Sequence, residues 1–102
     1  MIIGIDLGTT NSLVSYFTED GPVIIPNRFG DNLTPSIVSI DLEGHVYVGK
    51  VAKERKITWP ESTEEVFKRS IGTEKKFEIN GIKFSAEDLS SFEMRCLTED
   101  EE

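Results

Sequence analysis

At 102 residues the chain is long enough for one domain, or for a piece of a larger domain, with a buried core. Its 37% hydrophobic and 29% charged residues are typical of soluble globular protein, and no apolar run approaches the roughly 20 residues of a membrane span. The net charge of -8 argues against nucleic acid and anionic membranes as partners. A single cysteine, Cys96, excludes an intrachain disulfide and fits a reducing cytoplasm.

The first third of the chain predicts three short strands joined by turns. Two apolar runs with a β-branched bias, 2–5 and 13–17, each predict a strand. The segment EDGP at 19–22 predicts a turn into a third strand at 23–25, so the strands form an antiparallel meander. Proline, glycine, asparagine and aspartate gather in 26–36, which predicts a loop.

The middle of the chain predicts a hairpin and two short helices. Residues 36–40 alternate polar and apolar side chains, and a DLEG turn leads from them into the run HVYVG. Residues 49–57 place apolar side chains among lysine and arginine, which predicts an amphipathic helix that ends before the next proline. The S-x-x-E pattern of Ser62 and Glu65 predicts the capped start of a second helix, VFKRSI, which ends at Gly72.

The last third predicts a hairpin and a longer helix. An Asn-Gly pair stands between the apolar runs of FEINGIKF, a strong hairpin signal. Ser85 and Asp88 predict the capped start of a helix whose apolar residues repeat at helical spacing. Glu93 follows Leu89 by four residues on the buried stripe, so we expect it to be either exposed or close to a cation. Strand pairs followed by interleaved helices predict an α+β fold.

The polar turn DLGTTNS separates the first two strands and is the first candidate site. Asp6 stands at the end of an apolar strand that we expect to be buried, where a carboxylate needs a counter-charge, a metal or hydrogen-bond donors. Gly8, Thr9 and Thr10 offer backbone N–H groups and two hydroxyls that suit a phosphate. Asp6 would then attract magnesium through water. The alternative is a plain hairpin whose side chains satisfy their own backbone, and spacing alone leaves both interpretations open.

Lys68 is the second candidate, in the segment STEEVFKRSIG. A cation there could reach a terminal phosphate and stabilise the charge that develops in a transition state. A solvated lysine on a helix is the ordinary alternative, and nothing local decides between the two. The chain contains neither G-x-x-x-x-G-K-[ST] nor G-x-G-x-x-G, so any nucleotide would be held by the hairpin turn.

These stretches resemble a known family. GIDLGTTNS is similar to the first phosphate-binding segment of the Hsp70/DnaK chaperones, and actin and the sugar kinases share its looser outline. Four further stretches occur in the order of the Hsp70 amino-terminal region: GDNLTPSIVSI, VGKVAKE, FKRSIG and INGIKFSAEDLSS. The resemblance runs from Ile2 to about Leu97. It implies part of an actin-like ATPase (ribonuclease H-like) fold, in which 1–35 supply the first strands and phosphate turn and 36–102 a small mixed subdomain of the same lobe.

The resemblance also implies roles for individual residues in binding ATP or ADP. The contacts to the β- and γ-phosphates fall on the turn: Gly8, Thr9, Thr10 and Asn11. Asp6 corresponds to an aspartate near the magnesium ion and its water shell. Lys68 corresponds to a lysine that helps to position the attacking water and the γ-phosphate, which would make Lys68 and Asp6 the catalytic residues.

For a full-length protein the resemblance implies a cytoplasmic, stress-response chaperone that hydrolyses ATP to drive the binding and release of unfolded polypeptides. Its partners would be J-domain and nucleotide-exchange co-chaperones. The family's second phosphate segment, adenosine pocket and further catalytic carboxylates do not occur in these 102 residues. We therefore expect the piece alone to bind magnesium nucleotide weakly or not at all and to lack ATPase activity.

Two other functions stay open from the sequence. One is a sugar or acetate kinase relative that uses the same turn, which TPSIVSI and FKRSIG disfavour. The other is an inert structural or interaction module. In the resembled fold, the strand at 2–5 also pairs with a strand from later sequence, so we expect its open edge here to make the chain self-associate.

Overall fold

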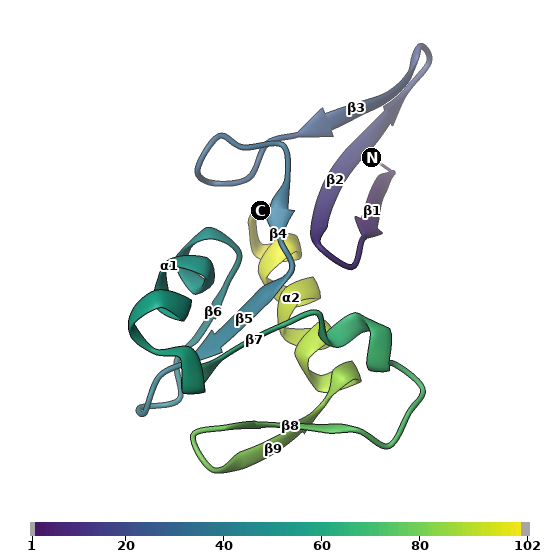
Figure 1. Ribbon diagram of the computed structural model, residues 1–102. Coiled ribbons are helices and arrows are strands. Elements are labelled where there is room, and N and C mark those ends of the chain that lie inside the picture. Colours follow the sequence, from purple (N-terminus) through teal and green to yellow (C-terminus); the bar gives the residue numbers. More distant parts are fainter. Residues whose placement is uncertain (1, 101–102) are drawn as a thin grey trace.

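The computed structural model describes residues 2–100, and the side chains of 2–98 (Figure 1). Its strands are β1 (Ile3–Leu7), β2 (Asn11–Thr18), β3 (Gly21–Ile25), β4 (Thr34–Pro35), β5 (Ile37–Ile40), β6 (Val46–Val48), β7 (Thr63–Glu65), β8 (Lys76–Ile79) and β9 (Ile82–Ser85). Its helices are α1 (Lys50–Thr58), α2 (Ala86–Asp100) and the 3-10 turns η1 (Pro60–Ser62) and η2 (Phe67–Ser70). The mixed content confirms an α+β chain.

The first sheet is the predicted antiparallel meander, in the order β1-β2-β3. β2 is its central strand, and its amino-terminal end also pairs with β4, which lies within the segment predicted to be a loop. This sheet buries little of its surface, because within β1, β2 and β3 only Ser12, Val14 and Ser15 are buried. Figure 1 shows it extending away from the helices, and the whole molecule measures 48 × 29 × 20 Å.

The second sheet has the order β6-β5-β7 and contains the predicted hairpin of β5 and β6. Every residue of β5 is buried, so the polar and apolar alternation in its sequence does not mark an exposed face. Ser39 is tolerated inside because it accepts hydrogen bonds from Arg55 Nε at 2.8 Å and Thr63 Oγ1 at 2.9 Å. The predicted helix at 49–57 is confirmed as α1.

The predicted capped helix beginning at Ser62 is wrong. Residues Thr63–Glu65 instead form β7, which pairs with β5, and only the 3-10 turn η2 follows. Val66 between them has φ 58°, a left-handed conformation that no α-helix contains. The Ser62 hydroxyl donates to Asn80 Oδ1 at 2.5 Å rather than capping a helix. Pairing with a buried strand therefore overrides the local helix signal.

The predicted Asn-Gly hairpin is confirmed as β8 and β9, with positive φ at both Asn80 and Gly81. The capping box before α2 is also confirmed: the Asp88 amide donates to Ser85 Oγ, and the Ser85 amide donates to the Asp88 carboxylate, each at 3.0 Å. These hydrogen bonds lower the pKa of Asp88. They hold the start of the helix that carries Glu93.

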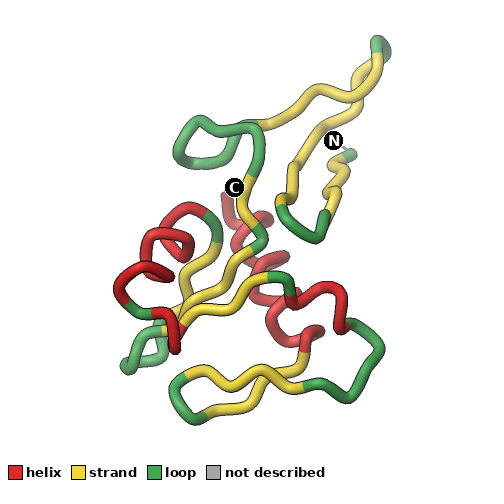
Figure 2. Tube along the Cα trace, viewed as in Figure 1, coloured by secondary structure: helices red, strands yellow, loops and turns green. Residues whose placement is uncertain are grey.

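The main hydrophobic core lies between β5, η2, the β8–β9 hairpin and α2, which Figure 2 shows gathered in one part of the molecule. Its buried members are Val38, Ile40, Phe67, Phe77, Ile79, Ala86 and Leu89. The first sheet contributes none of them, so it is attached to this core mainly by the polar contacts of the β1–β2 turn. Within 2–100, neither helix has the length and hydrophobicity needed to cross a bilayer.

Asp41, at the end of β5, provides a test of acid stability. Partial removal from water acts to raise its pKa, but hydrogen bonds from the His45 amide, the Tyr47 hydroxyl, the His45 ring and the Glu43 amide together lower it from 3.8 to about 2. A depressed folded-state pKa means that Asp41 stabilises the fold above about pH 4 and loses this contribution as the pH falls through 2. Asp41→Asn should therefore lower the urea midpoint at pH 6 and have progressively less effect toward pH 2, with Asp31→Asn as a loop control. An equal loss at both pH values would contradict this assignment.

The free edge of β1 allows the expected self-association to be tested. Within the described chain β1 pairs only with β2, and Ile3 on it is 44% exposed. Sedimentation at rising concentration should show a monomer–dimer equilibrium that Ile3→Lys weakens. Ile57→Lys is the matched control, because Ile57 is 85% exposed on α1, away from this edge. A clean monomer at high concentration would contradict the expectation.

Candidate functional site

The candidate site is the turn between β1 and β2, residues 8–10. Gly8 is required by the turn itself, because a Cβ there would overlap the carbonyl oxygen of Asn11. The Thr10 carbonyl accepts a hydrogen bond from the Ser36 amide at 2.9 Å, which ties the turn to the segment before β5. Within the described chain, the amides of Thr9 and Thr10 donate to no other group. Two neighbouring N–H donors are therefore available to an anion.

A cavity of about 200 Å³ opens beside this turn. Its walls are formed by Thr9, Thr10, Asn11, Pro35, Ser36, Ile37, Lys53, Glu65 and Val66. Three of the four predicted phosphate contacts therefore face one cavity, together with a lysine from α1. Glu65, which also lines the cavity, forms an ion pair with Lys56, which offsets part of its negative charge. The cavity could admit a small anionic group against the turn.

Asp6 does not line this cavity. It lies opposite Leu13 in the β1–β2 register, whereas Ser12 lies opposite Leu7, so Asp6 and Ser12 belong to opposite faces of the hairpin. The strand before Asp6 was predicted to be buried, but β1 is only partly buried and Asp6 itself is exposed. An exposed carboxylate needs no counter-charge, and it can still contact hydrated Mg²⁺, which usually keeps several waters in proteins. Among the described residues, no three His, Cys, Asp or Glu side chains cluster to ligate a metal directly.

Lys68 lies behind the turn, not in the cavity. Its side chain is 7% exposed, and Nζ donates to the Gly8 carbonyl at 2.8 Å, to Ser12 Oγ at 3.0 Å and to Ser36 Oγ at 3.1 Å. Nζ also lies 2.8 Å from Oε2 of Glu93, in an ion pair without the alignment of a hydrogen bond. The catalytic role predicted for Lys68 stays a prediction.

Glu93 is fully buried and close to a cation, which confirms one of the two expectations for it. Its Oε1 accepts a hydrogen bond from Ser12 Oγ at 2.5 Å and lies 3.1 Å from Ser36 Oγ. We call Lys68, Glu93, Ser12, Ser36 and the Gly8 carbonyl the Lys68 network. It joins the turn, the start of β5, η2 and α2 through a single buried cluster of polar groups.

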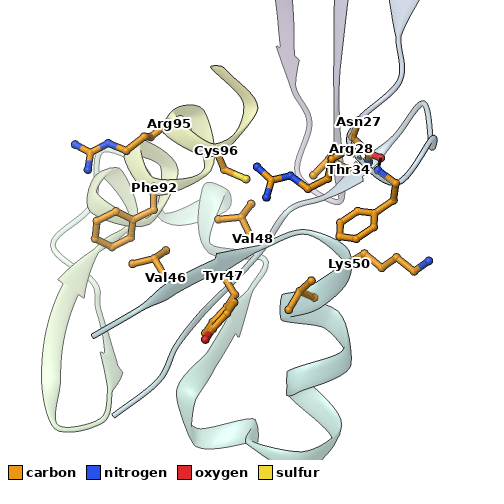
Figure 3. Close-up of a pocket in the computed structure, with 12 residues that line it drawn as sticks. Asn27, Arg28, Thr34, Val46, Tyr47, Val48, Lys50, Phe92, Arg95 and Cys96 are labelled. Carbon is orange, nitrogen blue, oxygen red and sulfur yellow. Dashed lines mark hydrogen bonds between the residues drawn. The ribbon is translucent and has the colours of Figure 1, made fainter. Parts of the chain in front are cut away.

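A second cavity, of about 240 Å³, lies elsewhere on the molecule (Figure 3). The side chains that line it come from the loop after β3, from β4, from β6, from α1 and from α2. None of the residues predicted to contact a nucleotide takes part in it. We therefore assign the candidate site to the cavity beside the turn.

Comparison with known proteins shows which family the chain belongs to. A family model described as "Hsp70 protein" matches residues 2–95, which is most of the chain. The chain belongs to the Hsp70 family. Two Hsp70 relatives are both named "Chaperone protein DnaK", one from Thermotoga neapolitana and one from Thermotoga petrophila, and each is 39% identical to this chain over 102 residues. The match covers 99% of this chain and 17% of each relative's length.

Sequence patterns alone missed several residues of this Hsp70 chain's site. Lys53 carried no signal, because it stands among other charged residues of α1 and reaches the cavity only through the packing of α1 against the second sheet. Ser12, in DLGTTNS, and Ser36, in TPSIVSI, lie within stretches noted above, but neither was assigned a role, because isolated serines are common in loops and strands. The one usable signal was Glu93, whose place on an apolar stripe predicted that it would be either exposed or close to a cation.

Proposed function

We propose that this Hsp70 chain is the amino-terminal part of a nucleotide-binding domain, in which Gly8, Thr9, Thr10 and Asn11 bind the phosphates of ATP or ADP. The observation that carries the proposal is the cavity of about 200 Å³ beside the turn, which Thr9, Thr10 and Asn11 help to line. The backbone amides of Thr9 and Thr10 have no other acceptor in the described chain. Lys53 adds a positive charge at the wall. Backbone donors with a nearby cation are the usual protein ligands of a phosphate group.

The same proposal assigns Mg²⁺ to the exposed carboxylate of Asp6, through the ion's water shell. The ion would neutralise phosphate charge and polarise the phosphoryl group during hydrolysis. The side chain of Asp6 is suited to that contact because it is accessible to water. Lys68 is proposed to act on the terminal phosphate, which requires its ammonium to leave at least one of its present acceptors.

For a whole protein that carries this segment, we propose an ATP-driven chaperone. It would bind and release unfolded polypeptides and work with J-domain and nucleotide-exchange co-chaperones in the cytoplasm. Because this chain spans 17% of the length of its DnaK relatives, we propose that it supplies one part of the nucleotide site and does not hydrolyse ATP alone. The kinase alternative has no support from those relatives, which are both named as chaperones.

The test is an NMR titration of the ¹⁵N-labelled chain with Mg-ADP. The expected result is weak binding, with a dissociation constant of about 1 mM, and shifts concentrated at the amides of Thr9 and Thr10. Lys53→Ala should weaken this binding, whereas Lys83→Ala on β9 should not, because Lys83 does not line the cavity. Shifts that saturate around the second cavity, or no shift at the turn, would contradict the proposal.

Hydrolysis is tested separately in a chimera. Residues 2–97 of this chain replace the corresponding segment of the Thermotoga neapolitana relative, and ATP turnover is measured with and without Asp6→Asn. We expect turnover in the chimera and a loss of at least about tenfold on removing the carboxylate charge. A chimera that folds and binds ATP but never hydrolyses it would contradict the proposed contribution of this segment.

A further inference from the structure

We propose that Glu93 sets the anion affinity of the phosphate turn by holding Lys68 behind it, an inference that rests on the proposed function of the turn. In the state described here, Lys68 is withheld from any phosphate at the turn. Breaking its pair with Glu93 leaves the ammonium without a counter-charge and lets it exchange a serine hydroxyl for that phosphate. Glu93 is thus a positioning residue, because it acts on the site through Lys68 without lining the cavity itself.

The geometry shows that Lys68 has no donor to spare. An ammonium has three N–H groups, and the Gly8 carbonyl and two serine hydroxyls accept all three, while Glu93 Oε2 lies 2.8 Å from Nζ as a charge partner without hydrogen-bond alignment. A phosphate oxygen could be added only by replacing one of these acceptors. The Gly8 carbonyl belongs to the turn itself, so Nζ is already next to the segment that a phosphate would contact.

Charge leads to the same conclusion. Glu93 is completely buried and Lys68 nearly so, which places both charges in a medium that screens them weakly. At the turn their fields largely cancel, so the closed pair adds little attraction for an anion. Replacing the carboxylate by a neutral amide would leave the positive charge of Lys68 uncompensated. Because Nζ contacts the Gly8 carbonyl, next to the Thr9 amide in the chain, an anion at the turn would then be attracted by the full charge of the ammonium.

The pair also links the turn to α2. Glu93 lies in the second turn of α2, and the capping box of Ser85 and Asp88 holds the start of that helix. The 3-10 turn η2, which carries Lys68, packs against α2. The two serines that share the carboxylate come from β2 and from the segment before β5. A displacement of α2 would therefore withdraw Glu93 and release Lys68 toward the turn.

The direct test compares the chain with its Glu93→Gln variant, using inorganic pyrophosphate as the probe and the amide shifts of Thr9 and Thr10 as the signal. Glutamine keeps the size and the acceptor oxygen but removes the charge. We expect pyrophosphate to bind about tenfold more tightly to Glu93→Gln, the effect of one uncompensated charge in a partly screened site. Equal or weaker binding would overturn the proposal.

A double variant identifies the source of the gain. In Lys68→Met/Glu93→Gln the gain should disappear, because it depends on the freed ammonium. Lys68→Met/Glu93→Leu replaces both charges by apolar groups and should likewise lack the gain, because no ammonium remains to be released. A large loss of affinity in this last variant would show that Lys68 already contributes and would overturn the proposal even if Glu93→Gln failed to fold.

A ligand-free measurement separates this inference from the proposed function. Acylation of each lysine by an N-hydroxysuccinimide ester is followed by mass spectrometry, with Lys53 as the internal reference. In Glu93→Gln, Lys68 should react at least about tenfold faster than in the unmodified chain, because it is no longer held by a buried counter-charge. Unchanged reactivity would overturn the inference. Faster reaction without pyrophosphate binding in either protein would support the hold on Lys68 and reject the phosphate turn.

Discussion

Gly8→Ala should lower the free energy of unfolding by about 1–3 kcal/mol and abolish the binding of Mg-ADP at the turn. The new Cβ would overlap the Asn11 carbonyl oxygen, and backbone on both sides would have to move. That movement would also shift the Gly8 carbonyl, which accepts hydrogen bonds from both Lys68 and Ser36. Urea denaturation and the NMR titration measure the two effects.

Gly4→Ala is the matched control for this substitution. Gly4 lies on β1, the strand that leads into the turn, but a Cβ there meets only side-chain atoms, the nearest at 3.1 Å on the ring of Phe17, which is 53% exposed and able to move. We expect a clearly smaller loss of stability and unchanged nucleotide shifts. Equal losses in the two variants would mean that the turn tolerates a different backbone path and that Gly8 is not needed for its shape.

Removing one member of the buried ion pair should have the largest effect on stability. Lys68→Met leaves the Glu93 carboxylate buried without a counter-charge, and Glu93→Leu leaves the Lys68 ammonium buried without one. Each should lower the free energy of unfolding by about 3–5 kcal/mol. The double variant Lys68→Met/Glu93→Leu should recover most of that loss, because both charges leave together and apolar groups of similar volume replace them.

Urea denaturation of the two single variants and the double variant gives the coupling energy of the pair directly. Lys56→Met is a suitable comparison, because Lys56 also pairs with a glutamate but is 46% exposed there. An exposed pair of that kind contributes about 1 kcal/mol or less. If the single variants at Lys68 and Glu93 lower the free energy of unfolding no more than Lys56→Met does, the buried pair does not hold the first sheet to the core.

The sequence predicted best where the signal was local. The meander, the Asn-Gly hairpin and the capping box at Ser85 and Asp88 each depend on a few adjacent residues, and each was confirmed. The capping box at Ser62 and Glu65 had a similar pattern but failed. Those residues pair with β5, and no local pattern contains information about a buried strand more than twenty residues earlier.

The site was predictable only in part for the same reason. The turn from Gly8 to Thr10 was identified from its own composition, and Thr9, Thr10 and the following Asn11 line one cavity. The contribution of Lys53 and the enclosure of Lys68 depend on tertiary packing between distant segments. Glu93 was expected to be either exposed or near a cation, and only the fold shows that it is buried and that the cation is Lys68.

The wide sequence separation within the Lys68 network has a consequence for biosynthesis. Its members are drawn from residues 8 to 93, so the last of them emerges from the ribosome long after the first hairpin. Until then the early strands lack their anchor and present unsatisfied backbone to other nascent polypeptides. Premature pausing before α2 is synthesised should therefore yield a species prone to aggregation, and contacts of such long range should make the final assembly slow.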